Sequence, residues 1–182
     1  MTRKEIRPPG GPAELGTALS YASYELPAGV EDFYSELNGF EVAWRSDRTG
    51  YGQPAEGSIN LLPVQRIFGD WRGTVWFESA GDERFRDVKP FDLFQPEACM
   101  AFRQPPDESP EDHVQLHVFG EEVTATAYTF TDYVDRLLVS RGFSYWQTTL
   151  CDDAQETPEA KRFRDRAPAL FPDIDLGLFV PR

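Results

Sequence analysis

The chain has 182 residues, of which 40% are hydrophobic and 14% aromatic, a composition typical of a folded globular protein and not of a disordered one. The 31 Asp and Glu exceed the 18 Lys and Arg and leave a formal net charge of −13, which argues against nucleic acid as a partner because phosphate binding needs clustered Lys and Arg. The same charge favours attraction to a basic protein, although acidity can also serve solubility alone.

Residues 1–11, "MTRKEIRPPGG", predict a loose N-terminal arm. No apolar run follows the basic start, so no secretory signal is expected, and no stretch approaches the roughly 18 apolar residues of a membrane span. We therefore expect a cytoplasmic protein with no membrane partner. Cys99 and Cys151 are far apart and form no CxxC pair, so two buried free thiols are the expectation, with a disulfide between them left open.

Two helices are predicted next. The first runs over 12–24, with Pro12 at its first position. In the second, "LPAGVEDFYSELNGFEV", apolar residues recur at i, i+3, i+4 and i+7 from Val30, which is the spacing of a helix and not of a strand. Asn38-Gly39 therefore marks a helix end and not a hairpin, with Gly39 as the left-handed closing residue.

Short strands and a hairpin follow, and then helices. Strands are predicted over 40–44, 58–64, 74–79, 98–104, 113–119 and 123–130, the last two joined by a Gly-Glu-Glu turn, whereas 81–97 is predicted to have little regular structure. A helix is predicted from Thr131, with Gly142 just past its end and Thr129 and Asp132 spaced as a capping box, and a shorter one from Thr157-Pro158. The order predicts an α+β fold with one mostly antiparallel sheet of about six strands, a domain over 12–150, and an extension over 151–182 packed on it.

Signs of catalysis are few. His113 and His117 are the only histidines, and on one strand they would share a face and could line a groove with Gln115. Two imidazoles make a poor metal site by ligand count. Gly142-Phe-Ser144 lacks the Gly-x-Ser-x-Gly pattern of a nucleophile elbow, and the four tryptophans are expected to fill the core. We predict no catalytic, cofactor-binding or metal-binding residues, and hence a protein that is not an enzyme.

Acidic residues are the remaining candidates for a functional site. They cluster in the loop "DESPED", in the Gly-Glu-Glu turn and on the polar face of the helix that starts at Val30. Whether the fold brings these segments together does not follow from the sequence. The candidate partner-binding residues are Glu31, Asp32, Glu36, Asp107, Glu108, Glu111, Asp112, Glu121 and Glu122.

Several segments in order resemble the SUKH superfamily, also called the Smi/Knr-type cell-wall-regulator-like family. They are "LPAGVEDFYSELNGFEV", "LLPV" with "IFGDW", and "YTFTDYVDRLLVSRGF", spread over about residues 12–146. The resemblance implies a curved, mostly antiparallel sheet with flanking helices. It carries no catalytic residues to this chain, and the part from about Cys151 onward has no counterpart in the family pattern.

The resemblance also implies a function, because bacterial members are mostly immunity proteins that bind and neutralise polymorphic toxins. We therefore expect an intracellular immunity protein, a monomer or weak dimer, that occludes a basic, nucleic-acid-targeting toxin without a cofactor. One alternative is a non-catalytic regulatory or scaffold domain of the same family. The other is a small-molecule-binding or hydrolytic protein that uses a groove near His113 and His117.

Overall fold

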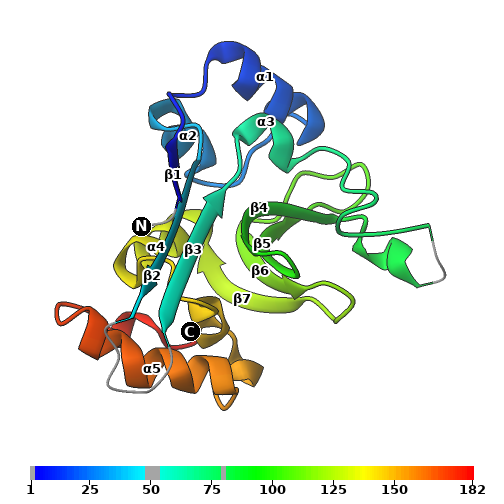
Figure 1. Ribbon diagram of the computed structural model, residues 1–182. Helices are drawn as coiled ribbons and strands as arrows, with labels where there is room; N and C mark the ends of the chain where they lie inside the picture. The colour runs from blue at the N-terminus through cyan, green and yellow to red at the C-terminus, as the bar shows by residue number, and fades with distance from the viewer. Residues whose placement is uncertain (1–2, 48–53, 79–80) are drawn as a thin grey trace.

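One antiparallel sheet organises the computed structural model, which describes residues 3–47, 54–78 and 81–182 (Figure 1). Within these ranges the sheet has seven strands, each paired with the next along the chain. The strands are β1 (Arg3–Ile6), β2 (Phe40–Ser46), β3 (Ala55–Leu61), β4 (Val88–Gln95), β5 (Ala98–Arg103), β6 (His113–Val118) and β7 (Thr124–Thr129). The α+β fold is thus confirmed, with one strand more than the six expected.

The helices occupy both ends of the sheet and one of its faces. Helices α1, α2 and α3 gather at one end of the sheet. Helix α5 crosses the other end, beside the last residues of β2 and the first residues of β3 (Figure 1). The α-helices are α1 (Pro12–Tyr21), α2 (Val30–Glu36), α3 (Val64–Ile67), α4 (Phe130–Ser140) and α5 (Pro158–Leu170). The 3₁₀ turns are η1 (Asp82–Phe85), η2 (Trp146–Leu150), η3 (Asp152–Ala154) and η4 (Leu176–Leu178). Among the described residues, no helix has the length and apolarity to cross a membrane.

Helix α4 packs on the sheet through aromatic side chains. Phe130 lies edge-on to Phe91 of β4 at 5.4 Å between ring centroids, and Tyr133 meets the same ring at 5.2 Å. The predicted capping box is confirmed, since the Thr129 hydroxyl accepts from the Asp132 N–H while Asp132 accepts from the Thr129 N–H. The C-terminal extension adds Phe163 and Phe179 to the same buried core.

The Asn38-Gly39 pair joins the end of α2 to the end of β3. Asn38 Oδ1 accepts from the Val64 N–H at 2.9 Å, which satisfies a backbone donor in the first turn of α3. Gly39 has the predicted positive φ, 80°, but the helix itself ends at Glu36, with Leu37 as its extended C-cap. A Cβ on Gly39 would lie 2.4 Å from the Leu61 carbonyl oxygen, so the close approach of β3 also requires glycine.

Strand β1 corrects the prediction of a loose arm over residues 1–11. Residues 3–6 pair with β2, with Ile6 opposite Phe40. The sequence of β1 has no hydrophobic alternation, so its pattern did not predict a strand. Backbone pairing with β2 holds the segment in place, and Ile6 remains 58% exposed. The first helix also ends at Tyr21 instead of Tyr24, since Ser23 and Tyr24 both have positive φ.

Segment 81–97 is a second correction, because β4 runs through it. Lys89, Pro90 and Asp92 interrupt the apolar pattern, and the register with β5 shifts at Pro90 and again after Asp92. Pro90 and Asp92 are nevertheless buried. A proline and a charged residue are rare in a central strand, so the sequence pattern did not predict one here.

Segment 74–78 is a third correction, because it forms a turn where a strand is predicted, and Ser79 lies outside the described residues. The Gly73 N–H donates to the Trp76 carbonyl at 2.8 Å and the Val75 N–H to the Trp71 carbonyl at 2.9 Å. Backbone groups are thus satisfied locally, and the turn places the consecutive Val75 and Trp76 side chains in the core.

Candidate functional site

Two of the predicted acidic segments meet on the surface. The Ala28 N–H, just before α2, donates to Asp112 Oδ1 at 2.9 Å, and the Ser109 hydroxyl donates to Glu25 Oε2 at 2.9 Å. These bonds hold the loop 107–112 against the start of α2. We call the combined surface the acidic face. Its predicted members, all exposed, are Glu31, Asp32, Glu36, Asp107, Glu108, Glu111 and Asp112.

The acids of this face differ in how far they are engaged within the fold. Asp112 accepts the Ala28 bond, and Glu111 lies 3.9 Å from Arg103 and accepts from Gln115 at 3.3 Å. Glu36 and Glu108 make no side-chain hydrogen bond or ion pair with any residue that the structure describes. Their carboxylates are therefore available to a partner.

The Gly-Glu-Glu turn does not join the acidic face. It follows the last residue of β6, whereas the loop 107–112 precedes the first, so the length of that strand separates the two acidic segments. Glu122 forms an ion pair with Arg84, which further reduces the local negative charge. Of the nine predicted residues, Glu121 and Glu122 are thus the two that the fold sets apart.

The two histidines do not share a face, so they do not line a groove together. His113 is exposed, whereas His117 is fully buried against the rings of Phe85 and Phe119, at 4.6 and 5.5 Å between centroids. A register shift between His113 and Gln115 breaks the simple alternation that predicted a shared face. Burial lowers the pKa of His117, with Arg84 acting in the same direction, so this imidazole is neutral near pH 7.

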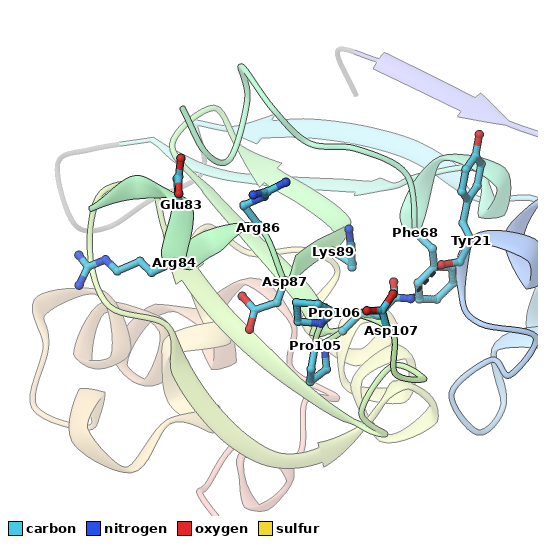
Figure 2. Close-up of a pocket in the computed structure, with 11 residues that line it drawn as sticks. Tyr21, Phe68, Glu83, Arg84, Arg86, Asp87, Lys89, Pro105, Pro106 and Asp107 are labelled. Carbon is cyan, nitrogen blue, oxygen red and sulfur yellow. Dashed lines mark hydrogen bonds between the residues drawn. The ribbon is translucent and has the colours of Figure 1, made fainter. Parts of the chain in front are cut away.

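A cavity of about 510 Å³ opens beside the acidic face, and Asp107 belongs to both (Figure 2). Tyr21 and Phe68 form one side, and residues of η1 and of the segment that leads into β4 form the other. A second cavity of about 420 Å³ shares lining residues with it and extends it toward Trp76. The residues common to both are Tyr21, Phe68, Glu83, Arg86 and Lys89. We call these two cavities together the groove.

Lys89 and Gln104 define the chemistry of the groove. Lys89 Nζ is half-buried and donates to the Gly69 carbonyl at 3.1 Å, and burial lowers its pKa although Asp70 and Asp87 oppose that shift. Gln104 Nε2 donates to the Tyr21 and Glu108 carbonyls, at 2.8 and 3.3 Å. The amide thus ties the end of α1 to the acidic loop, so the groove and the acidic face form one continuous region.

A buried carboxyl was missed by sequence reasoning. Asp92 is fully buried on β4, where Oδ1 accepts from the Asn60 N–H at 2.8 Å and Oδ2 accepts from the Tyr133 hydroxyl at 2.5 Å. Burial raises the pKa of Asp92 to about 6, although both hydrogen bonds oppose the shift. The available signal is a single charged residue between the apolar Phe91 and Leu93, inside a segment predicted to have little regular structure.

Other candidate residues belong to the core. Trp71, Trp76 and Trp146 are buried as expected, and half-buried Trp44 donates its Nε1–H to the Arg141 carbonyl at 2.6 Å. Cys99 and Cys151 are buried free thiols, and burial raises the pKa of both, to about 12 for Cys151. Neither thiol is therefore an activated nucleophile.

Within residues 3–47, 54–78 and 81–182, no group of three or more His, Cys, Asp or Glu side chains is arranged to hold a metal ion. Comparison of the sequence with models of known protein families, and with curated proteins, finds no match. The geometry of the acidic face and the groove is therefore the basis for a functional proposal.

Proposed function

We propose that this chain is an immunity protein that binds a basic toxin inside the cell that produces it and blocks the toxin's active site or substrate groove. One observation carries the proposal: two hydrogen bonds hold the loop 107–112 against the residues that lead into α2, so the two segments that adjoin there carry seven exposed acids. The resemblance to the SUKH superfamily supports the same function and supplies the expected kind of partner.

The mechanism is electrostatic and steric. A face rich in exposed carboxylates attracts a basic surface over a distance of about 10 Å at ordinary salt and speeds the encounter. Once docked, Glu36 and Glu108 pair with the Lys or Arg side chains by which a nucleic-acid-targeting toxin would hold its substrate. The exposed ring of Tyr24, next to the bonded Glu25, offers an aromatic anchor at the edge of the face.

The proposal is tested by co-producing the protein with the toxin encoded beside its gene. The informative variant is the double charge reversal Glu31→Lys, Glu108→Lys, which we expect to abolish protection of the producing cell and co-purification of the toxin. A matched control is Glu121→Lys, Asp165→Lys, which makes the same charge change at exposed positions outside the acidic face and should still protect.

Two results would contradict the proposal. A neighbouring toxin that kills cells producing the unaltered protein, and that does not co-purify with it, would remove the toxin partner. Recovery of the protein with host regulatory proteins instead, in a manner lost in the Glu31→Lys, Glu108→Lys variant, would favour the regulatory or scaffold alternative on the same face.

A further inference from the structure

A third cavity, of about 200 Å³, lies at the end of the sheet that α5 crosses. It is bounded by α5, by the end of β2 and by the start of β3. Phe143 and Ser144 contribute to its wall, and their backbone is fixed there by an isolated bridge from Phe143 to Gly57 and by the Ser144 N–H, which donates to the Glu56 carbonyl at 3.0 Å. The lining residues are Arg45, Pro54, Ala55, Glu56, Phe143, Ser144, Arg162 and Arg166.

The charge of this cavity is opposite to that of the protein. Three arginines and one glutamate line it, whereas the chain as a whole has 31 acids and 18 Lys and Arg. Three guanidinium groups around a small space repel one another. An anion bound in the cavity would offset this repulsion.

Two of the three arginines, Arg45 and Arg162, receive little charge compensation from within the described residues. Arg162 makes no hydrogen bond or ion pair with any described residue, and the one ion pair of Arg45 is with Asp47 at 3.6 Å, at a site where both side chains are more than half exposed. Such an exposed pair contributes little. Glu56 lies opposite Arg45 in the β2–β3 ladder, yet no ion pair joins these two described side chains.

The framework around the cavity is well anchored. Arg162 and Arg166 are four residues apart on α5 and so lie on one face, while Phe163 and Ala167 of the same helix are buried in the core. The Ser144 hydroxyl accepts from Gln95 Nε2 at 3.1 Å, which leaves its own hydrogen able to donate into the cavity. The backbone that carries these donors is thus held in place around the cavity.

We propose that this cavity binds a phosphoryl group, which the forked donors of Arg45, Arg162 and Arg166 would hold through charge-assisted hydrogen bonds. Guanidinium groups match the oxygens of phosphate in geometry as well as in charge. The volume suits phosphate or pyrophosphate and is below the roughly 300 Å³ at which pockets for larger organic ligands begin. A bound phosphoryl group would also tie α5, and with it the 151–182 extension, to the sheet.

The test is isothermal titration calorimetry with sodium pyrophosphate, sodium phosphate and AMP, at constant ionic strength set with sodium chloride. We expect saturable binding of at least one of them, weakened about tenfold or more in Arg162→Ala and in Arg45→Ala, since each removes a charge-assisted donor. Binding of AMP would identify the source as the phosphoryl group of a larger molecule, and binding of the inorganic anions alone would identify free phosphate.

The matched control is Arg66→Ala. Arg66 is exposed on α3, at the opposite end of the sheet, and its cation lies over the ring of Trp71 without an ion pair to any described residue (Figure 1). This variant should bind the anion as the unaltered protein does. No saturable binding below about 10 mM of any of the three ligands, or equal weakening in Arg66→Ala and Arg162→Ala, would overturn the proposal.

Discussion

The acidic face and the Asp92 site use the same chemical group in opposite surroundings. On the face, exposed carboxylates such as Glu36 and Glu108 keep their hydration and contribute almost nothing to folding. At the Asp92 site, one carboxyl is fully buried and is held by two hydrogen bonds from different elements. The contrast teaches that surroundings, and not residue type, decide whether an acid stays available to a partner or supports the architecture.

Asp92 supports the sheet where its ladder is weakest. Strands β3 and β4 share a single register pair, Leu61 with Asp92, before they diverge. The Asp92 side chain accepts the Asn60 N–H that a neighbouring strand would otherwise satisfy, and the Tyr133 hydroxyl adds a link to α4. One carboxyl therefore joins β3, β4 and α4.

The largest expected effect is on the pH dependence of stability. Asp92 has its pKa raised from 3.8 to about 6, so between these values the folded state binds a proton that the unfolded state does not. Its contribution to the free energy of unfolding is thus greatest below about pH 4 and falls by about 3 kcal/mol as pH rises through 6. Asp92→Asn removes this titration, so its stability relative to the unaltered protein should rise over the same pH range.

Urea denaturation of both proteins at pH 4, 5, 6 and 7 measures that difference. Comparison with the variant cancels the contributions of other carboxyls, including Asp132, whose pKa is lowered by hydrogen bonds from Thr129 and Arg182 against the effect of burial. Parallel stability profiles for the two proteins would show that Asp92 is not the buried titrating group.

A smaller loss is expected for Tyr133→Phe. The ring stays packed against Phe91 and Trp146, but the hydroxyl that donates to Asp92 is removed. At pH 7 the carboxylate then loses a charge-assisted bond, and we expect the free energy of unfolding to fall by about 2 kcal/mol. Tyr24→Phe is the matched control, because Tyr24 is 81% exposed, and an equal effect in both variants would contradict the role of the buried hydroxyl.

Local patterns predicted the elements that are stabilised locally. Apolar spacing identified α2 from Val30 onward, the capping box identified the start of α4, and the hairpin of β6 and β7 followed from alternation around a glycine turn. Strands β1 and β4 were missed, because the first depends on backbone pairing and the second carries Lys89, Pro90 and Asp92, which are typical of loops.

The candidate site was predictable in composition but not in arrangement. Its seven acids could be named from the sequence, yet the bond between Ala28 and Asp112 spans 84 residues of chain and leaves no local signal. The same is true of the separation of Glu121 and Glu122 from the face, which follows from the direction of β6. The role of Asp92 could not be predicted from the sequence, because the hydrogen-bond partners that make its burial tolerable come from other elements of the fold.

The smallest effect on stability should come from the acidic face. In the double variant Glu36→Gln, Glu108→Gln, neither side chain has a described partner to lose, so the free energy of unfolding should change by no more than about 0.5 kcal/mol. Association with a basic toxin should nevertheless slow, because two charges that steer the encounter are gone, and added salt should narrow the gap to the unaltered protein. Stopped-flow association at low and high salt measures this, with Glu121→Gln as the control outside the face. A double variant that is strongly destabilised, or that associates at an unchanged rate, would remove the distinction between the carboxyls proposed to recognise a partner and the one that supports the fold.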